Sequence, residues 1–167
     1  MYHFIDVEAS GFGAGSYPIE VGVALANGSL HCSLIRPLPH WQHWRDDAEA
    51  VHGITRESLL VSGRSPLEVA LLLNRCLDGQ IVYTDAWGND SCWLGLLFEE
   101  SGVRQRFRLE SIVTILTPAQ MERWQQTKQQ VIADSQLDRH RASQDALILQ
   151  RTYCELTDQK IDNLCST

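Results

Sequence analysis

The sequence predicts an α/β fold in which helices flank a mixed β-sheet. Three β-rich segments follow one another in the first 35 residues, and helical segments then alternate with extended ones. This order of segments is typical of a mixed sheet covered by helices. A chain of 167 residues fits one domain with a sizeable buried core, and no linker divides it. We therefore expect a single domain over residues 1–167.

The first half of the chain contains three expected strands, over residues 2–7, 19–26 and 30–35. The first strand is an apolar run of high β-propensity. A loop at 10–16, which contains three glycines, follows it. Asn27-Gly28 is a strong hairpin signal between the second and third strands. A loop opened by Pro37 then leads to a short expected helix at 46–52, which Gly53 ends.

The second half contains longer helices separated by extended segments. The first helix starts at a capping box, Ser65-Pro66-Leu67-Glu68, with Pro at the first helical position, and ends at Gly79. A buried strand at 80–84 precedes a helix at about 89–100, and residues 104–109 look extended. The last two expected helices cover residues 118–133 and 142–156.

Two acids at the end of the first strand predict a metal site. Asp6 and Glu8 stand two residues apart, so their side chains project from the same face of the strand. Two carboxylates held together at the end of a buried strand repel each other and are costly to desolvate. A hard divalent cation such as Mg²⁺ or Mn²⁺ relieves that repulsion. An exposed strand end is the alternative interpretation.

Three further residues complete a set suited to phosphodiester hydrolysis. Asp90 stands at the start of an apolar helix, and His140 and Asp145 flank the start of the last helix. Four carboxylates could hold two cations roughly 3.5–4 Å apart, which serve the attacking and leaving oxygens. A histidine of reference pKa about 6.5 suits proton transfer from water near neutral pH. His140 faces the site beside Asp145 if it precedes the helix, because five residues of continuous helix turn by about 500°.

Each of these three residues also has a purely structural interpretation. Asp90 could complement the dipole at a helix N-terminus, and a lone His140 is usually a surface residue. Asp85 competes with Asp90 for the role of ligand, because both lie in the segment after the fourth strand. The spacing from that strand and the apolar helix beyond it favour Asp90.

Four sequence blocks, in this order along the chain, resemble the DEDDh branch of the DEDD superfamily of 3′–5′ exonucleases. Asp6-Val7-Glu8-Ala9-Ser10-Gly11 is similar to D-x-E-T-T-G, and Val51-His52-Gly53-Ile54-Thr55 to V-H-G-I-T. Asp90 follows the strand Ile81-Val82-Tyr83, and His140-Arg141-Ala142-Ser143-Gln144-Asp145-Ala146 is similar to H-x-A-x-x-D-A. The resemblance covers residues 2–156 and leaves a tail at 157–167. The branch includes RNase T, oligoribonuclease and the proofreading subunit of bacterial DNA polymerase III.

The resemblance implies the ribonuclease H-like fold and a metal-dependent exonuclease. Such an enzyme releases nucleoside 5′-monophosphates from the 3′ ends of single-stranded RNA or DNA. Asp6, Glu8, Asp90 and Asp145 would hold two Mg²⁺ or Mn²⁺ ions, with His140 as general base. The expected substrate contacts are Ser10, Gly11, Phe12, His52 and Trp87. The chain departs from the family at Asp85-Ala86, where members carry His-Asn.

Several aromatic and basic residues have two open interpretations. Phe12 and Trp87 could stack on bases or pack in the structure. A loop rich in Trp and His could form an aromatic rim or cover the core; its residues are His40, Trp41, His43 and Trp44. Alternate residues Arg104, Arg106 and Arg108 could bind phosphate from one face of a strand, or guard an edge strand by charge. His52-Gly53 and Thr55 could simply end one helix and cap the next.

The charge of the chain limits the class of substrate. The net charge is −7: residues 1–103 carry −8 and residues 104–167 carry +1. Tight binding to long duplexes needs many phosphate contacts, so a short single-stranded 3′ end held through the metals fits better. Two alternatives remain open: a catalytically inactive binding or interaction module of the same fold, and a phosphohydrolase of small nucleotides. Related enzymes include dimers, so a homodimer is one expected assembly.

The sequence contains no sign of secretion or membrane insertion. No run of residues is apolar enough to span a membrane, and no basic segment followed by an apolar core begins the chain. The five cysteines are odd in number and form no C-x-x-C pair, which favours reduced thiols over disulfides or zinc. We expect a cytoplasmic protein.

Overall fold

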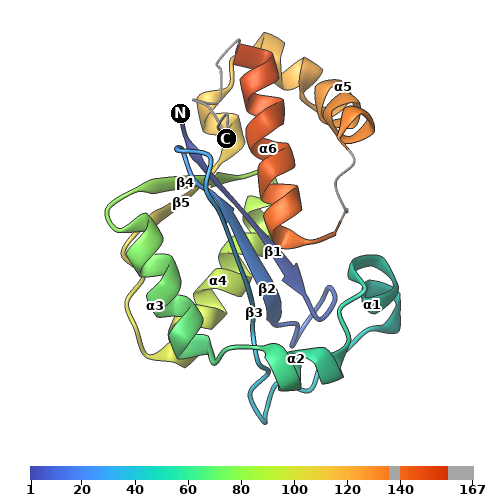
Figure 1. The fold of residues 1–167 in the computed structure, drawn as a ribbon, viewed down its shortest axis with the longest axis vertical. Coiled ribbons are helices and arrows are strands. Elements are labelled where there is room, and N and C mark those ends of the chain that lie inside the picture. Colours follow the sequence, from blue (N-terminus) through green and yellow to red (C-terminus); the bar gives the residue numbers. More distant parts are fainter. Residues whose placement is uncertain (136–139, 158–167) are drawn as a thin grey trace, which may run out of the picture.

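The computed structural model describes residues 1–135 and 140–157. Within these residues a five-stranded sheet has the order β3-β2-β1-β4-β5 (Figure 1). The strands are β1 (His3–Ala9), β2 (Pro18–Ala24), β3 (Leu30–Leu34), β4 (Ile81–Thr84) and β5 (Arg108–Ser111). The first three pair antiparallel, whereas β4 is parallel to β1 and to β5. The predicted mixed sheet is confirmed.

The chain order of the elements explains the two kinds of pairing. Short connections join β1, β2 and β3, and Gly28, with φ of 84°, turns the β2–β3 hairpin. Antiparallel strands can be joined by such short turns, whereas parallel strands need a crossover connection. The crossovers contain the helices α1 (Asp46–His52), α2 (Arg56–Ser62), α3 (Pro66–Leu77) and α4 (Trp87–Ser101). The chain then continues through a 3₁₀ turn (Ile112–Ile115), α5 (Pro118–Asp134) and α6 (Ala142–Thr157).

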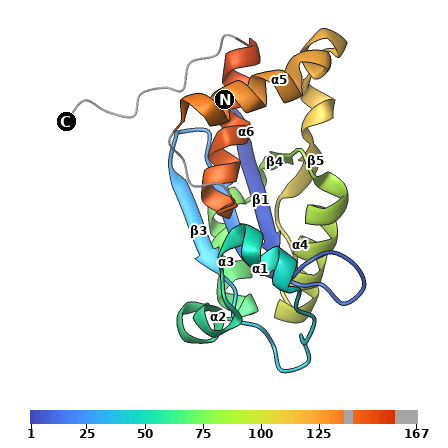
Figure 2. The same cartoon turned by 90° about the vertical axis from the view of Figure 1, so that its right-hand side faces the viewer.

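Helices cover both faces of the sheet. α6 packs on β1 and β2, and α5 packs on α6 (Figure 2). On this face Phe4 of β1 belongs to a hydrophobic cluster with Leu149 and Tyr153 of α6. On the other face Ile5 and Val7 of β1 belong to the larger cluster, which includes residues of α3 and α4. Successive residues of a strand point to opposite faces, so Asp6 and Glu8 share the α6 face with Phe4.

Two element predictions differ from the structure. α2 was not predicted, because Leu59 is its only buried residue and a single buried position gives no helical periodicity. β5 begins at Arg108, so Arg104 and Arg106 precede it and the predicted stripe of three arginines on one strand is wrong. Arg106 instead pairs with Asp78 at 2.5 Å, and Arg108 pairs with Glu110 at 3.1 Å.

The predicted capping box at the start of α3 is confirmed. Ser65 accepts the N–H of Glu68, and the Glu68 carboxylate accepts the N–H of Ser65, which completes the predicted capping box. Over residues 1–135 and 140–157, no helix has the length and apolar character to cross a membrane. Residues 158–167 of the predicted tail lie outside the described residues.

Candidate active site

A cavity of about 680 Å³ lies at the carboxyl end of β1. Its walls come from β1, the loop that follows, and the helices α1, α4, α5 and α6. All five residues that the sequence marked for catalysis line it: Asp6, Glu8, Asp90, His140 and Asp145. The fold therefore brings together side chains that are up to 139 positions apart in the sequence.

The strand β1 places two of these carboxylates. The apolar neighbours Ile5 and Val7 are buried in the core on the opposite face, which holds Asp6 and Glu8 toward α6. Across the strand pair, Asp6 stands opposite Gly22 and Glu8 stands opposite Glu20 of β2. The register changes between Glu8 and Ala9, so regular pairing ends where the cavity begins.

Asp90 reaches the cavity from the first turn of α4. Its side chain is buried, and its Oδ2 accepts a hydrogen bond from the Thr84 hydroxyl at the end of β4. The same hydroxyl accepts the N–H of Ala86 at 3.1 Å. The competing acid, Asp85, is turned toward α5, where Lys128 Nζ lies 2.6 Å from its Oδ2. Only Asp90 of the two acids lines the cavity.

The start of α6 supplies His140 and Asp145. His140 lies two residues before the helix, as the sequence argument required. Its φ is 62°, in the left-handed region, which costs roughly 1–2 kcal/mol for a residue other than glycine. The backbone N–H of His140 donates to Asp145 Oδ2 at 2.8 Å, which helps to hold this conformation. Candidate ligand atoms of Glu8, His140 and Asp145 all lie within 4.8 Å of one another.

Burial, together with neighbouring acids, raises the pKa values of two acids at the site. Burial raises the pKa of Asp6 well above its ordinary value, and the charges of Asp90, Glu8 and Asp145 raise it further. Burial also raises the pKa of Asp90 to about 7; Asp85 adds to this rise, whereas Thr84 and Lys128 oppose it. A divalent cation would offset both effects. The donors are carboxylate oxygens and one imidazole, so they fit a cation such as Mg²⁺ or Mn²⁺.

Three of the five predicted substrate contacts line the cavity, namely Gly11, Phe12 and His52. The Phe12 ring is 69% exposed and lies 5.9 Å from the Trp93 ring between centroids. Gly11 has φ of 135°, and a Cβ there would lie 2.8 Å from the Arg45 side chain. Only glycine therefore fits where the loop passes Arg45.

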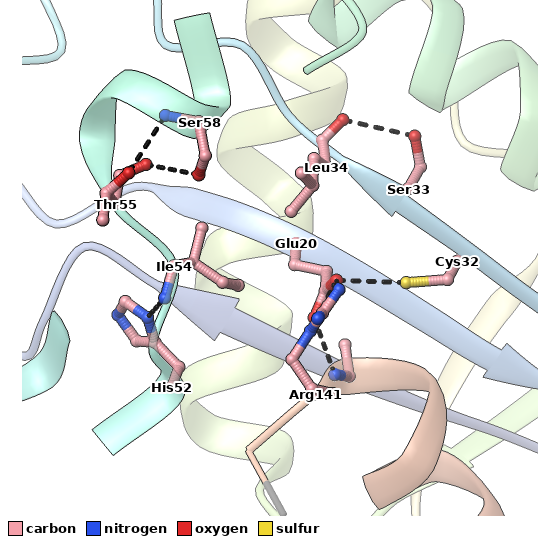
Figure 3. Close-up of polar contacts among 10 residues, drawn as sticks. Glu20, Cys32, Ser33, Leu34, His52, Ile54, Thr55, Ser58 and Arg141 are labelled. Carbon is pink, nitrogen blue, oxygen red and sulfur yellow. Dashed lines mark hydrogen bonds and ion pairs between the residues drawn. The ribbon is translucent and has the colours of Figure 1, made fainter. Parts of the chain in front are cut away.

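His52 combines a structural position with a polar atom beside the cavity. It is buried, and its Nδ1 accepts the N–H of Ile54 at 3.0 Å (Figure 3). The neutral ring therefore carries its proton on Nε2, which has no hydrogen-bond partner among the described residues. Burial lowers the pKa of His52. Gly53 and Thr55 also end α1 and cap α2, as the structural interpretation proposed.

The other two predicted contacts lie elsewhere. The buried Ser10 hydroxyl is hydrogen-bonded to His43 Nδ1 at 2.9 Å and accepts the N–H of Tyr17 at 3.1 Å. The Trp87 indole N–H donates to the carbonyl of Leu109 at 3.3 Å. Neither residue lines the cavity, and their role as substrate contacts stays a prediction.

The aromatic loop also has a structural role. Trp41 is buried and stacks on Tyr17 with ring centroids 5.0 Å apart. The guanidinium of Arg56 in α2 donates to the Trp41 carbonyl at 2.8 Å. This part of the loop covers the core, which was the second of its two interpretations.

Sequence reasoning missed two cations at the cavity. Lys128 comes from the middle of α5, a polar helix whose pattern gives no sign of a functional site. Arg45 binds Asp47 through Nε at 2.9 Å and Nη2 at 2.6 Å. Both cations line the cavity, and each is paired with an acid close to it in space.

Comparison with known proteins identifies the fold. The chain matches no protein-family profile and no curated protein sequence. Among solved structures, it is similar to E. coli exonuclease I in complex with a dA16 oligonucleotide, with a TM-score of 0.67 and 12% identity over 94% of this chain. The chain has the ribonuclease H-like fold of these exonucleases. The predicted fold class is thereby confirmed.

Two further structures show the same fold. Exonuclease I of Methylocaldum szegediense has a TM-score of 0.67 and 14% identity over 92% of this chain. A 3′-exonuclease, described with 3′-end-specific recognition of a histone mRNA stem-loop, has a TM-score of 0.68 and 17% identity over 96% of it. The chain spans 40%, 42% and 64% of the lengths of the Methylocaldum, E. coli and histone mRNA enzymes.

Replacing Asp6 by Asn should stabilise the metal-free protein. A carboxyl group whose pKa is higher in the folded than in the unfolded protein lowers the stability of the fold when it ionises. This loss of stability begins as the pH rises above the unfolded pKa, of about 3.9, and is complete above the folded pKa. Thermal unfolding in EDTA should therefore show a higher Tm for Asp6→Asn at pH 8, by roughly 2–4 °C per kcal/mol, and little difference at pH 4. Glu122→Gln, at an exposed acid of α5, controls for net charge. An unchanged or lower Tm at pH 8 would contradict the conclusion that the charged form of Asp6 destabilises the metal-free protein.

Proposed function

We propose that the chain is a metal-dependent 3′–5′ exonuclease acting on single-stranded RNA or DNA and releasing nucleoside 5′-monophosphates. The observation that carries this proposal is the convergence of Asp6, Glu8, Asp90, His140 and Asp145 on one cavity. The fold supports it, because the similar structures are exonucleases, one with a single-stranded oligonucleotide bound.

The four carboxylates are assigned to two Mg²⁺ or Mn²⁺ ions. Such ions, when bound, supply Lewis-acid activation of water and stabilisation of charge on the phosphate. To bind two cations, the chain must hold four carboxylates in place. β1, α4 and α6 each supply at least one of them. Without cations the same groups repel one another, as the raised pKa of Asp6 indicates.

His140 is assigned the role of general base. In this role its ring takes a proton from water, as histidine most often does in general acid–base catalysis. The left-handed backbone and the N–H bond to Asp145 fix the point from which the ring projects. Its ring also lies close enough to Glu8 and Asp145 to reach the same cation, so base and ligand roles need separate measurement.

The cavity walls suggest how a terminal nucleotide is held. The exposed ring of Phe12 offers a stacking surface for a base, which is independent of base identity. The Nε2–H of His52 offers a hydrogen-bond donor, and Lys128 Nζ offers positive charge for a phosphate. Lys128 and Arg45 are both paired with acids, so few cations are available to follow a long backbone.

Removing the metal should abolish hydrolysis. A 5′-labelled single-stranded oligomer should remain intact in EDTA and be degraded again when excess Mg²⁺ or Mn²⁺ is added. Asp145→Ala should lose nearly all activity while remaining folded, because the variant lacks a ligand that the cations need. Asp134→Ala is a matched control. It also removes a hydrogen-bonded carboxylate, because Asp134 accepts hydrogen bonds from Gln130 at the end of α5. Full hydrolysis by Asp145→Ala, or without metal, would reject the proposal.

Replacing His140 by Ala should reduce kcat by roughly 10²–10⁴-fold, the usual effect of losing a general base. His140→Asn should behave similarly, because an amide does not accept the proton. Calorimetric titration with Mn²⁺ should give the wild-type affinity for both variants if His140 is no ligand. Lost Mn²⁺ binding would reassign His140 as a ligand, and near-wild-type turnover would remove it from the mechanism.

Short single-stranded oligomers should be cleaved about as well as long ones, and blunt duplexes poorly. Few phosphates can be contacted, so the logarithm of the oligomer-binding constant should fall with only a shallow slope as the logarithm of the salt concentration rises. Lys128→Met should weaken binding to all sequences alike and reduce that slope by about 1. The same assay with free nucleotides as substrates distinguishes a polymer nuclease from a small-nucleotide phosphohydrolase. Tight binding to a long duplex would contradict the assignment.

A further inference from the structure

Glu20 of β2 is a buried acid with an unusual number of partners. Its side chain is 0% exposed and lies outside the cavity lining. Arg141 donates to it from Nη2 at 2.7 Å and from Nε at 3.2 Å to each oxygen. The Cys32 thiol donates to it at 3.2 Å. Figure 3 shows Glu20 between these two side chains.

Glu20 also accepts a hydrogen bond from the start of α6. The backbone N–H of Ala142 donates to its Oε2 at 2.9 Å. Burial alone would raise the pKa of Glu20, but the hydrogen bonds from Arg141, Ala142 and Cys32 bring it below its ordinary value. The group is therefore a carboxylate, and a negative charge near the first N–H groups of a helix is favourable.

A second residue of β2 fixes the same helix. A Cβ on Gly22 would lie 2.0 Å from Ser143 N and 2.1 Å from Ala142 C. The backbone of β2 is therefore in direct contact with the backbone at the start of α6. Glu20 and Gly22 are two residues apart and share a face of β2. Across the strand pair, they stand opposite Glu8 and Asp6. The strand thus fixes the start of α6 beside the two carboxylates of β1.

We infer that Glu20 is a positioning residue for the site, which acts through Arg141 and Ala142 to hold His140 and Asp145 against Glu8. His140 immediately precedes Arg141, and Asp145 lies one turn into the helix that Ala142 starts. The candidate ligand atoms of Glu8, His140 and Asp145 stay within 4.8 Å of one another only while α6 keeps this place on β2. The inference rests on the proposed nuclease function for its kinetic test.

The primary test uses Glu20→Gln and Arg141→Met, with Arg141→Lys as the conservative variant. Both disruptive variants should lower the single-turnover rate on a short single-stranded oligomer by roughly 10- to 100-fold, because small displacements of catalytic groups have effects of this size. KM should change by less than about threefold, because the base-stacking and phosphate contacts remain. Arg141→Lys should recover part of the rate, since it keeps the charge but not the planar fork.

Hydrogen exchange of the metal-free protein provides a readout that does not depend on activity. Amides from His140 to Ala146 should exchange faster in Glu20→Gln, whereas amides of β1 and β4 should keep their wild-type protection. Asn74→Ala is a matched control, because Asn74 is a buried polar residue that bonds the backbone of Arg104 and Arg106 at 2.9 Å, far along the chain from the site. It should lower Tm without changing the rate of the folded enzyme.

The outcomes separate the inference from the proposed function. A wild-type rate in folded Glu20→Gln, or an equal loss of protection in β1, β4 and α6, would overturn the positioning role. If the wild-type protein cleaves no oligomer, the proposed function fails, and the local exchange of residues 140–146 still decides whether Glu20 holds this segment.

Discussion

The repulsion among carboxylates gathered at the carboxyl end of β1 is the constraint on which the site depends. Asp6, Glu8, Asp90 and Asp145 come from three separate elements and line one cavity, although like charges at close range oppose folding. The scaffold keeps them there through contacts outside the cavity. Ile5 and Val7 anchor β1 in the core, the Thr84 hydroxyl binds Asp90, and Glu20 binds the start of α6.

The residues that stabilise the fold around the site are therefore different from the residues assigned to catalysis. Burial and neighbouring acids disfavour the charged forms of Asp6 and Asp90 in the metal-free protein, whereas the residues that place the site are apolar or hydrogen-bonded. Glu20 shows the contrast most directly, because it is the same residue type as Glu8 and stands directly opposite it in the sheet. Glu20 has a guanidinium, a thiol and a backbone N–H as partners, and its pKa is lowered. Burial and the charges of neighbouring carboxylates raise the pKa of Asp6.

Local sequence patterns predicted the parts of the fold that depend on short-range geometry. The two-residue period of a strand placed Asp6 and Glu8 on one face, and the helix period required His140 to precede α6. Lys128 and Glu20 could not be assigned roles in this way, because their roles arise from contacts across 43 and 121 positions of the chain. Ser10 and Trp87 do not line the cavity, and their hydrogen bonds to His43 and Leu109 could not be read from local patterns, because the partners lie 33 and 22 positions away.

The direction and metal dependence of degradation test the central claim most directly. A single-stranded oligomer labelled at its 5′ end should shorten one nucleotide at a time in the presence of Mn²⁺, giving a ladder of labelled products, and the released material should be nucleoside 5′-monophosphate. Asp6→Asn, a folded variant with one carboxylate fewer, should give no ladder. A labelled mononucleotide appearing at the start of the reaction, or a full ladder from Asp6→Asn, would contradict the central claim.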